Sequence, residues 1–335
     1  MALKVAILYT GETRTIEKTI DIFKRHVLEG TSDAAIHVFA VLQGDAGISP
    51  RIRETMGDHL KSLEWFDRAE PTWKSIQKRL LDTMPVDPRW KSYLENSGSM
   101  IEYYQLYLAY SNMCRVELST NTAYDFVMRI RPDIVINKPI DFSIFSIFSQ
   151  KQTYYTNLAN LMDHIRVRMG RNIRDDAPIT KQEIYILMNS LVDRGRYKHM
   201  THMHSNSPME KYYHENTEVD GLSANFSYDA LVKYIRSGQY VISLRKNVVY
   251  IANRQHFARI ASLGVMYGMH CMEGSERWFD AESQFETACI NGGFAVFNST
   301  TTLEDKSLYE YDSANYFEGG DVKSDSEFLF FICRK

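Results

Sequence analysis

The sequence predicts an α/β protein organised around a mainly parallel sheet, and the observations that predict it begin near the N-terminus. Residues 4–9 (KVAILY) and 35–42 (AIHVFAVL) are short apolar runs bounded by turn residues, as is typical of central strands. Between them, apolar side chains recur at helical spacing over residues 16–30. A strand, a helix and a strand at this spacing form a βαβ unit, whose right-handed crossover makes the two strands parallel neighbours.

A third strand is predicted within residues 124–142 (YDFVMRIRPDIVINKPIDF), and a helix precedes it. The pattern Ser99-x-x-Glu102 is a capping box, which predicts the start of this helix. Aromatic and apolar residues over 103–114 share one helical face. Residues 46–98 are polar and contain several prolines, so short helices and loops are expected there.

The remaining chain is predicted to add a second subdomain to the same unit. No internal repeat or low-complexity linker separates residues 1–145 from residues 146–335, so these are two halves of one integrated unit. In the second half, the expected elements are strands at 152–158 and 246–252 and helices at 180–192, 227–237 and 281–290.

Composition narrows the class of protein. The 335 residues are 44% hydrophobic and 24% charged, with a net charge of −3, which is typical of a globular domain and gives no overall basic field for nucleic acid. The four cysteines are widely spaced, so neither a disulfide framework nor a cysteine zinc site is expected. No apolar run approaches the roughly 18 residues of a membrane span. We therefore expect no transmembrane segment and a cytoplasmic location.

The predicted strand at 124–142 carries charges that a buried strand should not have. Side chains alternate along a strand, so Arg129, Arg131 and Asp133 fall on one side of it, near its carboxyl end. Burying a charge without a partner is costly, and ligands of open α/β sheets bind at the carboxyl ends of strands. These residues therefore either pair with one another inside the fold or bind a ligand.

The same stretch resembles the motif region of GT-A sugar-nucleotide glycosyltransferases. Those enzymes place an acidic Asp-x-Asp motif after a central strand, and here Asp133 matches the second aspartate while Arg131 takes the place of the first. The stretch is more similar to a subgroup from bacterial and large-DNA-virus glycan pathways, whose motif reads R-x-R-P-D. That subgroup also opens with a strand and a G-x-x-R turn, which matches Gly11 to Arg14 within the segment from Thr10.

The resemblance extends over residues 4–142 and implies a GT-A-like (Rossmann-type) fold with a mixed, mainly parallel sheet flanked by helices. Residues 36–39 are similar to the family's next strand, and Gln105 stands where the helix before the motif usually carries a glutamine. Residues 1–145 are then the half that binds the nucleotide-sugar donor, and residues 146–335 the acceptor-side half. If the chain is viral, the location is the host cytoplasm.

The implied donor is a UDP- or GDP-sugar, whose diphosphate becomes the leaving group. Its charge must be stabilised by a divalent metal or by arginines. The resemblance assigns Thr10, Gly11 and Arg14 to the donor site, and a helix start beside Arg14 favours phosphate binding. We expect Gly11 to allow a tight turn or a close approach of backbone rather than to act chemically.

The other donor-site residues implied by the resemblance belong to the charged strand. Arg129 and Arg131 would contact the phosphates, and Asp133 would hold Mn²⁺ or Mg²⁺. Because Arg131 replaces an acidic residue, an enzyme in which arginines take over part or all of the metal's role stays open as an alternative.

The acceptor side needs a general base if the reaction inverts the anomeric centre. Asp280 and Glu282 are the first candidates, although capping of a helix explains them equally well. Asp176 is a weaker candidate, since a solvated turn accounts for it. Trp278 is expected either to stack on a sugar or to pack in the core. His199, His202 and His204 match no familiar zinc spacing, so a surface loop is the simpler interpretation. The resemblance leaves open that one of them completes a metal site at Asp133.

Other classes fit the sequence less well. TGETRT has one glycine and so lacks the G-x-G-x-x-G of nicotinamide-dependent enzymes, and no Walker A pattern is present. We therefore expect a glycosyltransferase that moves a sugar from a nucleotide diphospho-sugar to a glycan or glycoprotein acceptor. A non-catalytic module that binds nucleotides or glycans is the alternative, and turnover of the sugar nucleotide separates the two.

Overall fold

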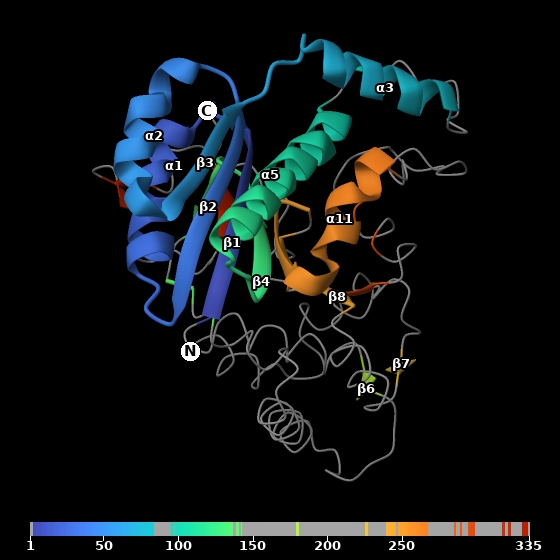
Figure 1. Cartoon of the computed structure of the whole chain (residues 1–335). Helices are drawn as coiled ribbons and strands as arrows, with labels where there is room; N and C mark the ends of the chain where they lie inside the picture. The colour runs from blue at the N-terminus through green and yellow to red at the C-terminus, as the bar shows by residue number, and fades with distance from the viewer. Residues whose placement is uncertain are drawn as a thin grey trace, which may run out of the picture.

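The computed structural model describes most of the first 142 residues and several segments of the rest (Figure 1). The described residues are 3–83, 95–96, 98–136, 139–140, 142, 179–180, 225–226, 239–245, 247–266, 285, 289, 294–298, 317–318, 321–322 and 330–333.

A seven-stranded sheet in the order β10-β8-β9-β4-β1-β2-β3 forms the centre of the molecule. Its strands are β1 (Leu3–Glu12), β2 (Ala34–Gln43), β3 (Leu60–Trp65), β4 (Phe126–Ile130), β8 (Tyr240–Arg245), β9 (Val249–Asn253) and β10 (Ala295–Asn298). The pairs β1–β2, β2–β3, β1–β4 and β8–β10 are parallel, whereas β9 runs antiparallel to both β4 and β8. The predicted α/β class and the mixed, mostly parallel sheet are therefore confirmed.

Three small antiparallel pairs accompany this sheet. They are β5 (Ile134–Ile136) with β13 (Phe330–Ile332), β6 (Ile179–Thr180) with β7 (Asn225–Phe226), and β11 (Phe317–Glu318) with β12 (Asp321–Val322). In the first pair, β13 near the C-terminus forms hydrogen bonds with β5, the strand that follows β4 after a short turn.

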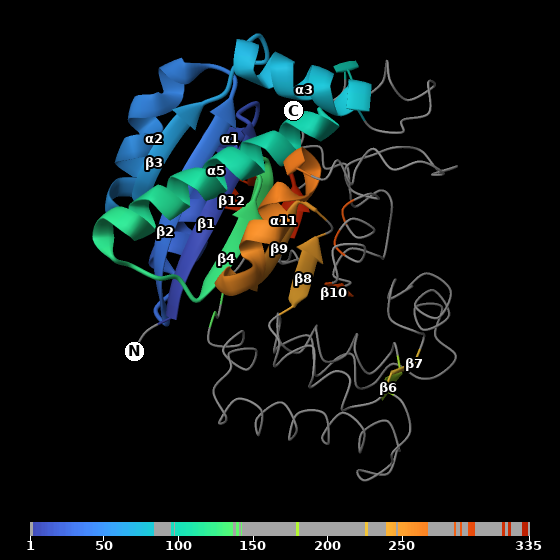
Figure 2. The same cartoon turned by 45° about the vertical axis from the view of Figure 1, so that its right-hand side comes forward.

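Helices cover both faces of the sheet (Figures 1 and 2). On one face lie α1 (Ile16–Phe23), which continues as the π-helical segment η1 (Lys24–Glu29), and α2 (Ser49–Met56), which lies between the short 3₁₀ turns η2 (Ala46–Ile48) and η3 (Gly57–His59). On the other face, α5 (Ser99–Thr120) crosses the strands and packs against α11 (Arg254–Met266). Helix α3 (Pro71–Thr83) follows β3. None of the helices in the described part of the chain combines the length and the apolar character needed to cross a membrane.

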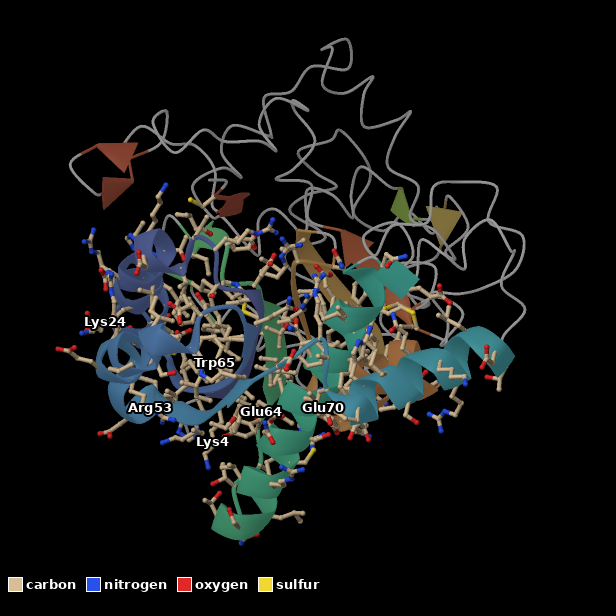
Figure 3. The ribbon with its side chains drawn as sticks, turned by 90° about the horizontal axis from the view of Figure 1, so that it is seen from above. Lys4, Lys24, Arg53, Glu64, Trp65 and Glu70 are labelled. Carbon is tan, nitrogen blue, oxygen red and sulfur yellow. The ribbon has the colours of Figure 1, made fainter. Side chains whose placement is uncertain are left out.

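The main core lies between the sheet and the α5–α11 layer. Alternate residues of the central strands, such as Leu8, Phe39 and Val127, pack there with aromatic residues of α5 and α11. At the edge of this layer, Glu64 of β3 lies against α5 (Figure 3), where its Oε2 accepts a hydrogen bond of 2.8 Å from Asn112 Nδ2. The alternation means that every second residue of β1 and β4 points toward α5.

Several sequence-based expectations need correction. The interval 46–98 contains strand β3, which the sequence did not indicate because LKSLEW is only partly buried at the sheet edge. Strand β8 and helix α11 were not predicted either. Helix α5 starts one residue earlier than a capping box requires, with Gly98 rather than Ser99 at the N-cap. The predicted start of the helix at Ser99 is therefore confirmed, but the capping box is not formed, and the carboxylate of Glu102 has other partners.

The expected elements of the second half are tested only in part. Strand β9 confirms most of the strand predicted at 246–252, and Phe285 and Cys289 are helical within the helix predicted at 281–290. Thr180 lies in β6 rather than at the start of a helix. The predicted strand at 152–158 and the helix at 227–237 lie outside the described residues.

The loops after β1 and β2 are joined at Gly44. The backbone N–H of Thr13 donates to the carbonyl oxygen of Gln43 at 2.9 Å, and Gly44 has a φ of +134°. A Cβ added at Gly44 would collide with Oγ1 of Thr13. Because Gly44 has no side chain, the loop after β2 can lie against Thr13, which fixes the position of the loop that carries Arg14.

We predict that Gly44→Ala lowers the free energy of unfolding by about 1–3 kcal/mol, from the unfavourable φ together with the collision. Urea unfolding measures the loss. Gly57→Ala is the matched control, because Gly57 has a positive φ of 50° but an added Cβ would meet no heavy atom within 4 Å, so it isolates the backbone contribution. A loss at Gly44 no larger than that at Gly57 would contradict the steric explanation.

Candidate functional site

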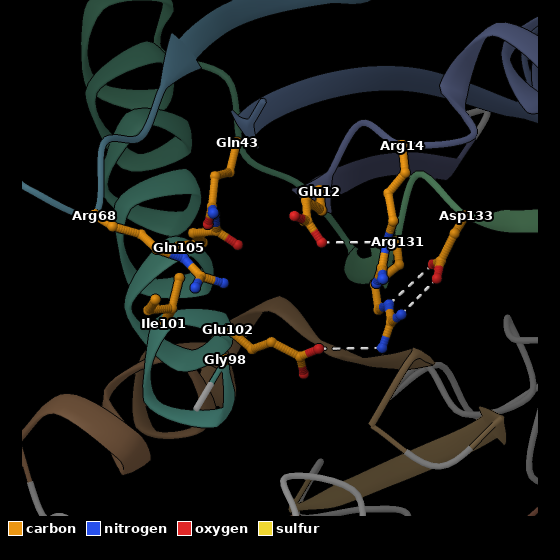
Figure 4. Close-up of a pocket in the computed structure, with 11 residues that line it drawn as sticks. Glu12, Arg14, Gln43, Arg68, Gly98, Ile101, Glu102, Gln105, Arg131 and Asp133 are labelled. Carbon is orange, nitrogen blue, oxygen red and sulfur yellow. Dashed lines mark hydrogen bonds and ion pairs between the residues drawn. The ribbon is translucent and has the colours of Figure 1, made fainter. Parts of the chain in front are cut away.

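A pocket of about 100 Å³ opens at the carboxyl ends of the parallel strands (Figure 4). It is lined by residues at or just after the ends of β1, β2, β3 and β4 and by the first turns of α5: Gly11, Glu12, Arg14, Gln43, Arg68, Gly98, Ile101, Glu102, Gln105, Arg131 and Asp133. The volume is smaller than the roughly 300–1,000 Å³ of a typical pocket for a whole ligand, so the described pocket can enclose only part of a larger ligand.

The order of the strands explains why the pocket lies here. From β1 the chain moves outward through β2 to β3, then returns to place β4 on the opposite side of β1. The connections on the two sides of β1 therefore diverge, which leaves a crevice beyond its carboxyl end. Such a switch point is where open α/β sheets bind their ligands.

Two arginines, one in strand β4 and one directly after it, lie on the side of the sheet that faces α5. Arg129 and Arg131 share the orientation of Val127, whose side chain packs in the core under α5. Arg131 comes directly after the last residue of the strand, and Arg129 lies inside it opposite Leu8 of β1. The expectation that both side chains fall on one side of the strand is confirmed.

Arg131 is held by two carboxylates. Its Nε and Nη2 donate to Oδ1 and Oδ2 of Asp133 at 2.9 and 2.5 Å, and its Nη1 donates to Glu102 Oε1 at 3.1 Å (Figure 4). The paired contact with Asp133 matches the planar fork of the guanidinium to the carboxylate. Arg131 is thus fixed in orientation at the edge of the pocket.

Arg129 lies behind Arg131 and is almost fully buried, with 3% of its surface exposed. Its Nε donates to Thr10 Oγ1 at 3.3 Å, its Nη1 donates to the carbonyl oxygen of Asn247, and its Nη2 lies 3.5 Å from Glu102 Oε2. The ion pair with Glu102 offsets the buried charge, while Nη2 makes no hydrogen bond within the described residues. Through these contacts Arg129 connects β4 with β1, α5 and the β8–β9 connection. It does not line the pocket itself.

Glu102 is the carboxylate shared by both arginines, and its role was not predicted. Besides the two arginines, it accepts a hydrogen bond of 3.0 Å from Asn247 Nδ2. The available signal was a single acidic residue in the otherwise apolar segment MIEYY, which the sequence pattern attributed to helix capping. Asn247 gave no comparable signal, since its position depends on how β8 and β9 return beside β4.

The neighbouring tyrosines supply no alternative negative charge. Tyr103 follows Glu102 in α5, and Tyr250 pairs with Arg129 across β4 and β9. Burial raises the pKa of both phenols well above the usual value. Both are therefore neutral near pH 7, so Glu102 is the anionic partner of Arg129 among the described residues.

The backbone of the Arg131–Asp133 turn is held from three directions. Thr19 Oγ1 of α1 donates to the carbonyl oxygen of Pro132 at 2.6 Å, and the N–H of Cys333 donates to that of Asp133 at 2.7 Å. On the β1 side, a Cβ at Gly11 would lie only 3.0 Å from Pro132 Cδ. The close approach expected at Gly11 is therefore present.

Two further arginines line the pocket with more exposure to solvent. Arg14 forms an ion pair of 3.2 Å with Glu12, and both side chains are more than 40% exposed. Arg68, in the loop after β3, is exposed and has no ion-pair partner within the described residues. These two guanidinium groups are the cations most accessible to a ligand.

No family model matches the chain, and no curated protein matches it. The residues of the pocket are therefore the basis for inferring function.

The predicted donor-site residues do come together. Gly11, Arg14, Arg131 and Asp133 line the pocket, and Thr10 contacts Arg129 directly behind it. Residues Gln43, Arg68 and Glu102 were not predicted as site residues.

The described residues alone do not form a site for Mn²⁺ or Mg²⁺. Both carboxylate oxygens of Asp133 bind Arg131, both of Glu102 bind nitrogen donors, and Glu12 is paired with Arg14. Within the described ranges no three His, Cys, Asp or Glu side chains gather as a ready-made metal site, although Mg²⁺ can also be held by one or two carboxylates together with substrate phosphates. The guanidinium of Arg131 occupies the place beside Asp133 where the resemblance implies a metal ion. A metal ion at Asp133 stays a prediction.

The predicted acceptor-side residues are not placed. Asp176, Trp278, Asp280, Glu282 and the three histidines at 199, 202 and 204 lie outside the described residues. Phe285, three positions after Glu282 in the sequence, is described, and its ring lies 4.5 Å from that of Tyr250.

We predict that Glu102→Gln lowers the free energy of unfolding by about 3 kcal/mol, because Arg129 would be left buried without a carboxylate. Glu12→Gln is the control, since its ion pair with Arg14 is exposed and worth only about 0–1 kcal/mol. Chemical denaturation measures both. Equal losses in the two variants would show that Glu102 is an ordinary surface carboxylate.

The buried tyrosines predict loss of stability at high pH. Burial raises the folded-state pKa of Tyr9, Tyr103 and Tyr250 above the value of 10.0 expected in the unfolded chain. Their contribution is complete below pH 10 and is lost as the pH rises above it, because the unfolded state releases these protons first. Tyrosinate absorbance and circular dichroism should therefore change together for the late-titrating phenols.

Tyr250→Phe tests this assignment. The hydroxyl of Tyr250 is buried and has no hydrogen-bond partner within the described residues, so its removal should leave stability at pH 7 unchanged or higher. Above pH 10 the variant should be more stable than the wild type. A variant with the same alkaline transition as the wild type would refute the assignment.

Proposed function

We propose that the protein is a glycosyltransferase that uses a nucleotide diphospho-sugar. The observation that carries the proposal is the position of the R-x-R-P-D turn, which meets the G-x-x-R turn in one pocket at the switch point of the sheet. In this proposal the sheet is GT-A-like, residues 1–145 bind the donor and residues 146–335 contribute the acceptor side.

The pocket suits the diphosphate of such a donor. Arg14 and Arg68 are accessible cations that can contact phosphate oxygens, and Arg131 is held in a fixed orientation by Glu102 and Asp133. Three arginines and three carboxylates line the pocket, so its net charge is near zero before a ligand enters. A diphosphate would therefore compete with Glu12 for Arg14, whereas Arg68 is available at once.

In the proposed reaction an acceptor hydroxyl oxygen forms a bond to the anomeric carbon. The bond from that carbon to the diphosphate oxygen breaks, and the diphosphate leaves with the electron pair. The guanidinium groups stabilise the negative charge that builds on the leaving group. The hydroxyl proton passes to a carboxylate, for which Asp280, Glu282 and Asp176 are the candidates in the case of inversion.

A bound divalent ion would supply further charge stabilisation, but no step here depends on it. The ion pairs of Asp133 support a role for this residue in orienting Arg131.

A non-catalytic module that binds a nucleotide or glycan is the second candidate. One observation favours it: each carboxylate that lines the described pocket is paired with an arginine, so none is free to act as a base. Release of the nucleoside diphosphate from a sugar nucleotide, with or without an acceptor, distinguishes an enzyme from a module that only binds.

Thermal shift with nucleotide sugars tests the proposed donor site. We predict that UDP- or GDP-sugars raise the melting temperature by several degrees at concentrations well above their Kd. The shift should persist in the presence of a chelator, because arginines provide the cations. A larger shift when Mn²⁺ is added would instead show that a metal ion takes part in donor binding. If none of the UDP-, GDP-, dTDP- and CMP-sugars changes the melting temperature, the donor-site assignment is wrong.

We predict that Asp133→Asn lowers sugar transfer by about 100-fold, because Arg131 loses the charged partner that fixes its orientation. Asp45→Asn is the control: Asp45 is a carboxylate in the loop after β2 that is not among the pocket-lining residues, and asparagine preserves its hydrogen bond to Gly47. Steady-state turnover measures both variants. Full activity in Asp133→Asn would remove this residue from the mechanism.

A further inference from the structure

The wall of the pocket opposite the Arg131–Asp133 pair has a different chemistry. It is formed by Gln43 at the end of β2, Arg68 after β3 and Gln105 of α5, here called the amide wall. Figure 4 shows these three side chains close together, on the opposite side of the pocket from Asp133. Two carboxamides and one guanidinium offer several donors and two acceptors, with a single charge.

Within the amide wall, the burial and the hydrogen bonding of Gln105 indicate a ligand. Only 2% of its surface is exposed, and its Nε2 is buried without a hydrogen-bond partner within the described residues. Buried amide donors are nearly always satisfied, because an unmade bond costs the full desolvation of the group. Gln105 lines the pocket, so a ligand can provide the missing acceptor.

Two other buried carboxamides, by contrast, have donors that are hydrogen-bonded. Gln77 of α3 is also buried, and its Nε2 donates to the carbonyl oxygen of Glu95 at 3.0 Å. Asn112, also in α5, donates to Glu64 at 2.8 Å. Gln105 differs from both in facing the pocket.

We propose that the amide wall binds the nucleoside end of the donor, with Gln105 Nε2 donating to a carbonyl or hydroxyl oxygen of that group. This inference rests on the proposed function. The diphosphate joins two dissimilar ends, and the charged turns at β1 and β4 suit the diphosphate itself. The amide wall lies on the β2–β3 side, opposite the turn that leads from β4 into the acceptor half.

The chemistry of the amide wall fits a nucleoside better than a second phosphate. Carboxamides bind neutral carbonyl and hydroxyl groups in both directions, as donor and as acceptor. The planar guanidinium of Arg68 is exposed and lies in the same pocket as the charged turns, so it can bind a phosphate oxygen next to the nucleoside and also an oxygen of the base. In this proposal a bare pyrophosphate binds the arginines of the β1 and β4 turns, and the group that accepts from Gln105 belongs to the nucleoside.

The test compares Gln105→Leu with the wild type in the full-length chain. Isothermal titration with pyrophosphate, UDP and GDP separates the two parts of the ligand. We expect the wild type to bind at least one nucleoside diphosphate about 10-fold or more tightly than pyrophosphate. In Gln105→Leu that advantage should fall to about 2-fold or less, with the Kd for pyrophosphate unchanged.

Stability of the free protein provides a second readout. Leucine removes an unpaired buried donor, so Gln105→Leu should keep or raise the melting temperature of the ligand-free protein. The control Gln77→Leu breaks an existing hydrogen bond and should lower it. If the branched leucine side chain prevents folding, Gln105→Met removes the same amide group with a flexible, unbranched side chain.

The outcomes separate this inference from the proposed function. If neither pyrophosphate nor any nucleoside diphosphate binds the wild type, the proposed function fails. If nucleoside diphosphates bind more tightly than pyrophosphate but Gln105→Leu retains the full advantage, only the amide-wall assignment is overturned. A drop in melting temperature as large as that of Gln77→Leu would likewise show that Gln105 is a packing residue.

Discussion

Arg129 carries a positive charge inside a strand whose five residues are all buried, and the surrounding structure is arranged to compensate that charge. Its partners come from three other parts of the chain: Thr10 in β1, Glu102 in α5 and Asn247 beside β9. Removing water from an arginine is costly unless several polar groups replace it. The ion pair with Glu102 therefore holds the start of α5 against the carboxyl end of β4.

The same ion pair shapes the pocket. Glu102 also binds Arg131, and Arg131 binds Asp133, so a continuous series of charged contacts runs from the core to the surface. The turn that carries Asp133 is fixed from below by Thr19 and Cys333. A site assembled in this way is rigid on the arginine side, which suits the orientation of a charged group. On the opposite wall the Nε2 of Gln105 has no hydrogen-bond partner within the described residues, and in our proposal a ligand supplies it.

The residues that were predicted and those that were missed differ in the range of the interactions that place them. The alternation of β4 was enough to put Arg129 and Arg131 on one side, because side-chain direction in a strand is a local property. Glu102 was assigned to a capping box from spacing alone, yet in the structure its partners are 27 and more residues away in the sequence. Local spacing cannot distinguish a carboxylate that caps its own helix from one that binds a distant strand.

By itself, the sequence determined the α/β class, the parallel βαβ start, the shared side of the two arginines and the tight approach at Gly11. Each of these follows from periodicity or from backbone conformation over a few residues. Only the tertiary structure decided that β9 returns antiparallel beside β4, that Asn247 reaches Arg129, and that Gln43, Arg68 and Gln105 form one wall. These contacts join residues far apart in the chain, and they depend on the order of strands in the sheet, which the burial of the whole core sets.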